Sequence, residues 1–173
     1  MSRRPAAAPA AIRLLVLDVD GVMTDGRLYY GPRGETLKVF HVRDGYGIQQ
    51  LARAGVHVAV ISGRNTPAVK TRCREIGIRH VFQGVQDKLA VFEKLRARLA
   101  LEPSECACVG DDVPDVPLMT HVGLAFAVAD AHPAARRAAH FVTTLPGGHG
   151  AVREVCDRLL QARTTSSGRR RTR

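Results

Sequence analysis

The sequence predicts an α/β fold, a doubly wound and mainly parallel sheet with a β-hairpin projecting from it. Short apolar runs alternate along the chain with amphipathic segments, and repeated βα units of this kind form parallel sheets with helices on both faces. Residues 26–42 interrupt this rhythm, because apolar and polar side chains alternate there around the turn signals Gly31-Pro32 and Gly34. The length of 173 residues favours a single domain.

The strands are predicted from short apolar runs that are followed by glycine or by polar loops. Residues 12–18 form such a run, which is typical of a parallel strand buried on both faces. Residues 56–61 and 106–109 have the same character and end at Ser62-Gly63 and at Gly110. In chain order, we expect strands at residues 12–18, 56–61, 80–82, 106–109, 122–128 and 141–142.

The helices are predicted from amphipathic stretches with proline near the start or glycine after the end. One stretch begins near Asp44 and stops at Gly55, and the next has Pro67 in its first turn and Gly77 after its last. In chain order, we expect helices at residues 44–54, 66–76, 86–101, near Pro133 and at 151–160.

The hairpin at residues 26–42 needs a partner surface. A lone two-stranded hairpin is only marginally stable in water. Its arms nevertheless carry large apolar side chains, namely Leu28, Tyr29, Tyr30, Leu37, Val39 and Phe40. We therefore expect the hairpin to pack against its own domain or against another subunit.

The net charge of +10 is high enough for a nucleic-acid-binding protein, so the location of the basic residues matters. Seven of the 26 basic residues lie at the two ends, and the remaining 19 nearly balance the 16 acidic residues. We expect a disordered leader at 1–11, a folded domain at 12–162 and a basic, disordered tail at 163–173. The tail is either a solvated extension or a weak contact for nucleic acid or another acidic surface.

Composition also indicates the compartment. No apolar run reaches the ~20 residues that a membrane helix needs, so we expect no membrane association. The cysteines form no CxxC pair and have too few neighbouring ligands for a zinc site; they are Cys73, Cys106, Cys108 and Cys156. We expect them to be buried and reduced, as in a cytoplasmic protein.

Two carboxylates follow the first expected strand, which is where α/β proteins place their ligands. Asp18 and Asp20 are separated by one residue, and Gly21 lets the backbone turn closely around a ligand. One carboxylate can attack a phosphorus atom while the other protonates the leaving oxygen. A polar loop with Asp as a turn residue would produce the same local pattern.

Two further groups follow the second and third expected strands. The Ser62 hydroxyl and the backbone N–H groups of Gly63 and Arg64 can bind phosphate oxygens. Lys88, at the start of a helix, is a candidate phosphate anchor. By itself, the first group is also consistent with a plain turn, and the second with a solvated surface charge.

A cluster of carboxylates follows the strand at residues 106–109. Asp111, Asp112 and Asp115 fall within five residues and repel one another unless a cation is present. Mg²⁺ is the usual hard cation where phosphate is handled. Every one of these groups follows a buried strand, so we expect all of them to meet at one edge of the sheet. The alternative for the carboxylate cluster is an acidic surface turn, which would not require the other groups to lie nearby.

The order of these groups resembles the four motifs of the haloacid dehalogenase-like phosphohydrolase superfamily. The stretches DVDGVMTDG, KVFHVRDGYGI, GDDVPDVPLM and LPGGHGAVREV are similar to those of the 3-deoxy-D-manno-octulosonate 8-phosphate phosphatase family. The resemblance covers roughly residues 12–160. It implies a Rossmann-like fold without a cap domain, an eight-carbon sugar acid phosphate as substrate in lipopolysaccharide precursor synthesis, and homotetramers in which the 26–42 hairpins assemble. The Arg-rich end lies outside the family pattern.

The resemblance also implies roles for the motif residues. Asp18 would attack phosphorus and form an aspartyl phosphate, and Asp20 would protonate the leaving oxygen and later activate water. Mg²⁺ would be held by Asp18, the main-chain carbonyl of Asp20, and Asp111. The remaining motif residues would hold phosphoryl oxygens (Ser62, Gly63 and Lys88) or orient the lysine, metal-bound waters or the loop (Asp112 and Asp115).

The carboxylate of a sugar acid calls for further cations. Arg64 and Arg72 lie eight residues apart, about two helical turns, so a shared face is expected if both belong to the helix. His149 and Arg153, in the GGHGAVRE stretch, are candidates to reach a site from the C-terminal part of the chain.

Three other functions remain open at this point. A phosphatase for a nine-carbon sugar acid phosphate would need very similar cations. A non-catalytic, basic nucleic-acid-binding protein on a hydrolase scaffold would need no intact motifs, whereas this chain retains all of them. A structural oligomer component would work through the hairpin and would release no phosphate.

Overall fold

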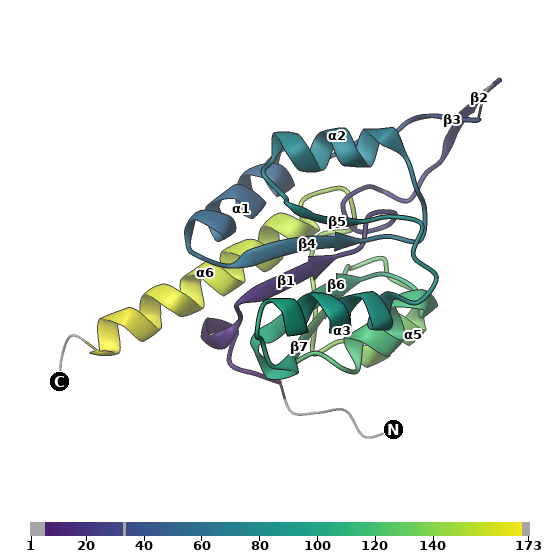
Figure 1. Cartoon of the computed structure of the whole chain (residues 1–173). Coiled ribbons are helices and arrows are strands. Elements are labelled where there is room, and N and C mark those ends of the chain that lie inside the picture. The colour runs from purple at the N-terminus through teal and green to yellow at the C-terminus, as the bar shows by residue number, and fades with distance from the viewer. Residues whose placement is uncertain (1–5, 33, 171–173) are drawn as a thin grey trace.

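The computed structural model describes residues 6–32 and 34–170, and it confirms the predicted α/β architecture. Six parallel strands form one sheet in the order β5-β4-β1-β6-β7-β8, and a separate antiparallel pair forms the hairpin (Figure 1). The sheet strands are β1 (Leu14–Leu17), β4 (His57–Ile61), β5 (His80–Phe82), β6 (Cys106–Gly110), β7 (Leu124–Ala127) and β8 (Phe141–Val142). The hairpin strands are β2 (Tyr29–Gly31) and β3 (Gly34–Leu37).

β1 lies in the interior of the sheet, between β4 and β6. All four of its residues are apolar and buried, as expected for a strand covered on both faces. Leu17 is in register with Val60 of β4 and with Val109 of β6. The three strands therefore end together, and the loops that follow them start from the same edge.

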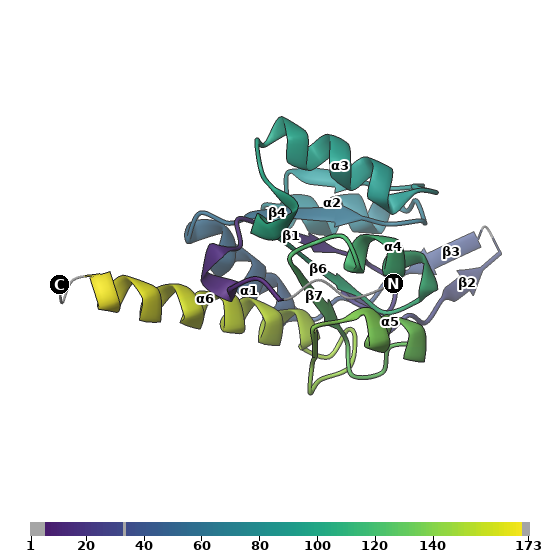
Figure 2. The ribbon, with the colours of Figure 1, turned by 90° about the horizontal axis from the view of Figure 1, so that it is seen from below.

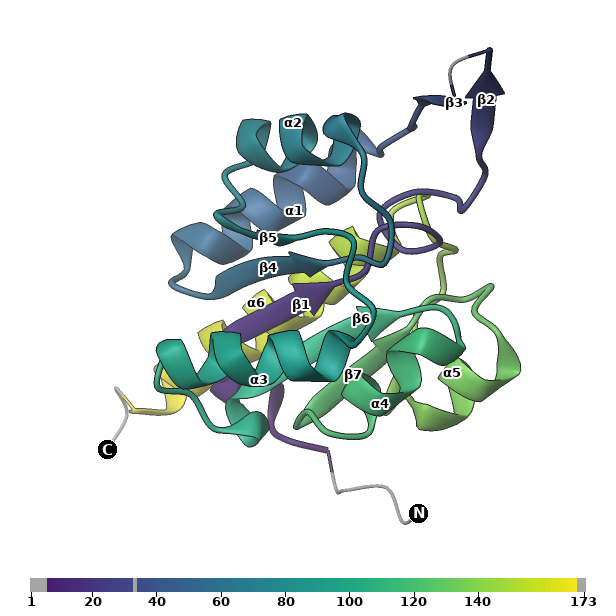
Figure 3. The same cartoon turned by 45° about the vertical axis from the view of Figure 1, so that its right-hand side comes forward.

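Helices cover both faces of the sheet. α1 and α6 pack together on one face, and α3 and α4 lie on the other (Figures 2 and 3). The α-helices of the described residues are α1 (Val42–Arg53), α2 (Pro67–Glu75), α3 (Lys88–Arg98), α4 (Val116–Met119), α5 (Pro133–Ala138) and α6 (Ala151–Arg170). Short 3-10 turns occupy Pro9–Ala11, Pro103–Glu105 and Val113–Asp115.

The C-terminal end differs from the expectation. We expected the last helix to end at Leu160 and a disordered tail at 163–173, but α6 continues to Arg170. Arg163 holds this extension against the core, because its guanidinium donates to the carbonyl oxygens of Ile12 (2.9 Å) and Ala54 (3.2 Å). Residues 171–173 of the expected tail lie outside the described residues.

The N-terminal end also differs from the expectation of a disordered leader at 1–11. The backbone N–H of Ala7 donates to Gly123 O at 2.8 Å, and Pro9–Ala11 forms a 3-10 turn that contacts α6. These contacts attach residues 7–11 to the domain. Residues 1–5 lie outside the described residues.

The hairpin projects from the edge of the sheet (Figure 1). Most of its apolar side chains remain exposed, among them Tyr30 at 64% and Leu37 at 52%, whereas Phe40 is partly buried against the core. The four cysteines are free and buried, as predicted. Among the described residues, no helix combines the length and the apolar character that crossing a membrane requires.

Candidate active site

The predicted motif residues meet at the edge where β1, β4 and β6 end. Asp18 follows β1, Ser62 follows β4, Asp111 follows β6, and Lys88 is the first residue of α3. The backbone N–H of Asp18 donates to Val109 O at 3.2 Å, which fixes the first loop against β6. The expected convergence is confirmed, because the contacts below join the loops of Asp18, Lys88 and Asp111 directly and the loop of Ser62 through Arg64.

Lys88 links two of the carboxylates. Its Nζ lies 2.7 Å from Asp18 Oδ1 and 2.7 Å from Asp115 Oδ1, and its side chain is only 8% exposed. Asp87 places the lysine, because its carboxylate accepts from the Ala90 N–H and so caps the N-terminus of α3. A buried ammonium needs such partners, since burial without them would favour the neutral amine.

Three carboxylates crowd together around this lysine. Oxygens of Asp18, Asp111 and Asp115 all lie within 4.8 Å of one another. Burial, together with the charge of Asp115, raises the pKa of Asp18 to about 6, although Lys88 opposes the shift. Burial, together with the charges of Asp18 and Asp115, raises the pKa of Asp111 to about 8. The site therefore lacks positive charge for the carboxylates that it holds.

This donor set fits a hard divalent cation. All three donors are carboxylate oxygens, the ligands that Mg²⁺ prefers, and a cation would relieve the repulsion that raises the two pKa values. Both oxygens of Asp115 already have partners, since Oδ1 accepts from Lys88 and Oδ2 accepts from the N–H groups of Asp111 and Asp112. Asp18 and Asp111 are therefore the better candidates for direct ligation, and Asp115 for orienting them.

Gly21 allows Asp111 to approach the first loop. A Cβ at Gly21 would lie 2.1 Å from Asp111 Oδ2, and the φ of +87° is itself unfavourable for other residues. The loop is also packed from the other side, where a Cβ at Gly147 would lie 1.8 Å from Gly21 O. The Gly148 N–H donates to Val22 O at 2.9 Å. Sequence reasoning found Gly21 but assigned no role to these two later glycines.

Asp20 belongs to a second charged cluster, which sequence reasoning missed. Lys38, between the hairpin and α1, donates to Asp20 Oδ1 and lies 2.8 Å from Glu35 Oε1. Arg64 Nη2 donates to Glu35 Oε2 at 2.7 Å, and Arg64 Nε lies 3.8 Å from Asp20 Oδ2. The available signal was a lysine within the apolar run LKVF, where a charge needs a specific partner.

Ser62 and Gly63 lie where they were expected, directly after β4. The Ser62 side chain is buried, and its Oγ accepts from the Arg64 N–H at 3.3 Å. Gly63 is exposed. Asp112 is also exposed, and its carboxylate caps the Val113–Asp115 turn by accepting from the Val113 N–H at 2.7 Å. The roles of these residues in binding stay predictions.

The structure does not bring Arg72 together with Arg64. Arg72 lies on α2, where its Nη1 donates to Glu75 at 3.5 Å and its guanidinium lies against Gly45 of α1. Arg64 precedes α2 and extends toward Asp20 instead. The condition for a shared helical face, that both arginines belong to the helix, is therefore not met. Their roles toward a substrate stay predictions.

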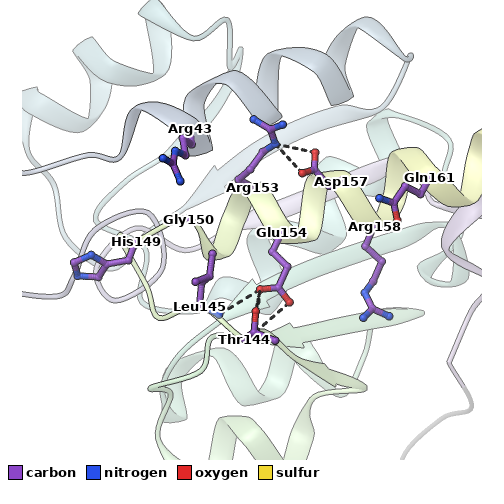
Figure 4. Close-up of a pocket in the computed structure, with 10 residues that line it drawn as sticks. All are labelled: Arg43, Thr144, Leu145, His149, Gly150, Arg153, Glu154, Asp157, Arg158 and Gln161. Atoms are coloured by element: carbon purple, nitrogen blue, oxygen red, sulfur yellow. Dashed lines mark hydrogen bonds and ion pairs between the residues drawn. The ribbon is translucent and has the colours of Figure 1, made fainter.

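His149 and Arg153 line a separate cavity of about 580 Å³ together with Arg43 and Arg158 (Figure 4). Arg153 is engaged there by Asp157, at 2.8 Å from Nε, and by the ring of Tyr46. Among the described residues, we find no side-chain contact that joins His149 or Arg153 to the Asp18 cluster. That either residue reaches a site stays a prediction.

Comparison with known proteins places this geometry in a family. The model of the haloacid dehalogenase-like hydrolase family matches residues 42–123. The 3-deoxy-D-manno-octulosonate 8-phosphate phosphatase KdsC of Yersinia pestis is 50% identical over 159 residues, which cover 92% of this chain and 85% of that protein.

Solved structures agree with the sequence match. The crystal structure of the Yersinia pestis phosphatase has a TM-score of 0.89 at 50% identity, covering 93% of this chain and 87% of that chain. The 3-deoxy-D-manno-octulosonate 8-phosphate phosphatase of Moraxella catarrhalis was solved in complex with a magnesium ion, a phosphate ion and a KDO molecule. Its structure has a TM-score of 0.89 at 38% identity, and the match covers 95% of each chain. This chain belongs to the 3-deoxy-D-manno-octulosonate 8-phosphate phosphatase family of the haloacid dehalogenase-like hydrolases.

Proposed function

We propose that this chain is a magnesium-dependent phosphatase that hydrolyses 3-deoxy-D-manno-octulosonate 8-phosphate. The observation that carries the proposal is the buried cluster in which Lys88 contacts Asp18 and Asp115, with Asp111 beside them. This cluster lies at the carboxyl edge of the sheet, the place where α/β proteins bind their ligands. Family membership supports the substrate.

Asp18 is the proposed nucleophile. Its carboxylate oxygen attacks phosphorus, the bond between phosphorus and the sugar oxygen breaks, and an aspartyl phosphate forms. Asp20 gives its proton to the departing sugar oxygen. In the second half of the reaction, Asp20 takes a proton from water, the water oxygen attacks phosphorus, and release of phosphate restores Asp18.

The phosphoryl oxygens need positive charge and hydrogen-bond donors. Lys88 supplies a fixed ammonium, while the Ser62 hydroxyl and the N–H of Gly63 supply donors at the end of β4. We assign Mg²⁺ to Asp18, Asp111 and the main-chain carbonyl of Asp20. When bound there, the cation would neutralise phosphate charge, so that an anionic nucleophile and an anionic substrate could approach each other.

Arg64 is the proposed partner of the substrate carboxylate. It lines a cavity of about 400 Å³ together with Tyr30, Glu35 and Thr66. Its Nε atom is buried and has no hydrogen-bond partner among the described residues, which leaves a donor for a ligand oxygen. Arg72 is a second candidate, for substrate that extends toward α1 and α2.

The hairpin supports a proposal of a homotetramer. Leu28, Tyr29, Leu37 and Val39 of the 26–42 segment are exposed apolar side chains that a second copy of the chain would bury. We further propose that the protein works in the cytoplasm, in the synthesis of lipopolysaccharide precursors. The free, buried cysteines are compatible with that reducing compartment.

A screen of phosphate release over sugar acid phosphates, run with and without Mg²⁺, tests the proposed function. We expect magnesium-dependent release that is fastest with the eight-carbon substrate, and no turnover by Asp18→Asn with folding intact. Faster release from a nine-carbon sugar acid phosphate would favour the alternative substrate. Substantial turnover by Asp18→Asn would contradict the nucleophile assignment, and no release from any substrate would leave a binding or structural role.

A further inference from the structure

Lys38 is a buried cation outside the four motif loops. It lies between β3 and α1, and its side chain is only 2% exposed. None of the reaction steps described above uses it. An ammonium group at such a position is costly to bury unless it has anionic partners that require it.

The partners of Lys38 form a closed ring of charges. Lys38 Nζ contacts Asp20 Oδ1 and lies 2.8 Å from Glu35 Oε1. The second oxygen of Glu35 accepts from Arg64 at 2.7 Å, and Arg64 Nε lies 3.8 Å from the second oxygen of Asp20. Two cations and two carboxylates therefore alternate, and each oxygen of Asp20 faces one of the cations.

This ring restricts the direction in which the Asp20 carboxyl points. A general acid must lie within about 2.6–3.2 Å of the oxygen that it protonates, so a small rotation of its side chain removes its contribution. Asp20 is partly exposed, with its side chain at 20%, and so the surrounding core alone does not hold it. Lys38, in contrast, is fixed by burial and by Glu35.

We propose that Lys38 is a positioning residue that orients the Asp20 carboxyl toward the leaving group, with Glu35 holding Lys38 in place. This inference rests on the proposed phosphatase function. Lys38 and Glu35 both come from the projecting segment, whereas Asp20 belongs to the loop after β1. The hairpin therefore contributes to the chemistry of its own subunit, in addition to any contact with another copy.

The effect on the leaving group provides the test. A sugar alkoxide needs a proton in order to leave, whereas p-nitrophenolate leaves without one. With Lys38→Met, we expect kcat/KM for the sugar phosphate, which reports on the first half of the reaction, to fall by roughly 10–100-fold, part of what a general acid contributes. The kcat/KM for p-nitrophenyl phosphate should change much less, because this ratio does not include the second half of the reaction, in which Asp20 activates water with either substrate. Lys38→Arg should restore part of the loss, and Lys70→Met, at an exposed position on α2, is the control.

A double variant separates positioning from a merely structural role. If Lys38 acts through Asp20, adding Lys38→Met to Asp20→Asn should cost little beyond Asp20→Asn alone. Equal losses of kcat/KM on both substrates, additive losses in the double variant, or a raised KM with unchanged kcat for the sugar phosphate would each overturn the proposal. Should Lys38→Met fail to fold, Lys38→Arg and Glu35→Gln permit the same comparison between substrates. A wild-type protein that releases no phosphate contradicts the proposed function itself, whereas an active wild type matched by Lys38→Met contradicts only this inference.

Discussion

Gly21 lies directly against the carboxylate of Asp111, so closely that a Cβ at Gly21 would come within 2.1 Å of Asp111 Oδ2. The contact joins the loop after β1 to the loop after β6 and leaves no space for a side chain. It brings together the two carboxylate-bearing loops that we assign to the cation.

Gly21→Ala should therefore weaken the binding of Mg²⁺ and lower turnover. The added methyl group displaces Asp111, and the φ of +87° adds backbone strain of about 1–2 kcal/mol. We expect a higher Mg²⁺ concentration for half-maximal phosphate release and a lower Tm. Gly55→Ala is the matched control, because its φ of +83° is similar but no atom lies within 4 Å of its Cβ position. Equal effects of the two substitutions on Mg²⁺ dependence would contradict this interpretation.

Lys88→Met should affect both catalysis and stability. It removes the cation that lies 2.7 Å from Asp18 and from Asp115, and so leaves buried carboxylates without compensation. We expect phosphate release to fall about 10²–10³-fold and the metal-free protein to lose about 3–5 kcal/mol of unfolding free energy. Kinetics and urea unfolding check the two effects, with Lys70→Met as control. Turnover within a few-fold of wild type would exclude Lys88 as a phosphate anchor.

Without a divalent cation, stability should fall as the pH rises from about 4 to 8. The pKa values of Asp18, about 6, and Asp111, about 8, lie above the ordinary value of 3.8 because burial and neighbouring carboxylates disfavour the charged forms. These two carboxyl groups therefore bind more protons in the folded protein than in the unfolded chain across this range, and the stabilisation that they contribute is lost as the pH passes through the raised pKa values.

Mg²⁺ should reverse this trend, because the cation and the protons compete for the same oxygens. Thermal unfolding in EDTA and in Mg²⁺ should show a larger increase in Tm at pH 8 than at pH 5. Asp111→Asn should lose most of this increase, whereas Glu102→Gln, at an exposed position before β6, should retain it. A Mg²⁺-induced increase in Tm that does not depend on pH would argue against a cation at these carboxylates.

Arg64→Ala should reduce the preference for sugar acid phosphates. The comparison uses the kinetics on a sugar acid phosphate and on the phosphate of a sugar that has no carboxylate. We expect KM to rise mainly for the sugar acid phosphate. Arg64→Lys, which keeps the charge but loses the planar set of donors, should recover only part of the preference. An unchanged ratio of kcat/KM values between the two substrates would remove Arg64 from substrate recognition.

Leu37→Asp combined with Val39→Asp should dissociate the expected tetramer. Both side chains are 52% exposed on the projecting segment, so charges there oppose an apolar interface without disturbing the core. Light scattering coupled to size exclusion measures the assembly. Val142→Asp, at an exposed position on β8, is the control and should leave it intact. A wild-type protein that is monomeric at micromolar concentration would contradict the tetramer directly.

The sheet and the motif cluster were predictable because their signals are local. Leu14–Leu17 and Cys106–Gly110 are unbroken apolar runs, since helices cover both sides of the strands. Parallel strands place their carboxyl ends at one edge, so Asp18 and Asp111 were expected at the same edge once the strands were identified. Their close approach also depends on the strand order, which places β1 beside β6.

The Lys38 cluster and the ends of the chain were not predictable in the same way. Alternation in the 26–42 segment identifies strands but does not reveal which loop a lysine will contact, and the ring with Asp20 joins residues distant in sequence. The extension of α6 beyond Leu160 has little apolar periodicity. It continues a helix that is already nucleated, and Arg163 anchors it by long-range hydrogen bonds to the core.

The contact of Gly147 and Gly148 with the loop after β1 has a consequence for protein synthesis. The carboxylates of Asp18 and Asp20 leave the ribosome well before the segment that packs against their loop, because this segment follows all the strands in chain order. A nascent chain that already contains all the strands still lacks this support and α6. We therefore expect the growing polypeptide to acquire its working pocket only after Gly147 and Gly148 have emerged, so that translation products truncated before them carry the motifs without the activity.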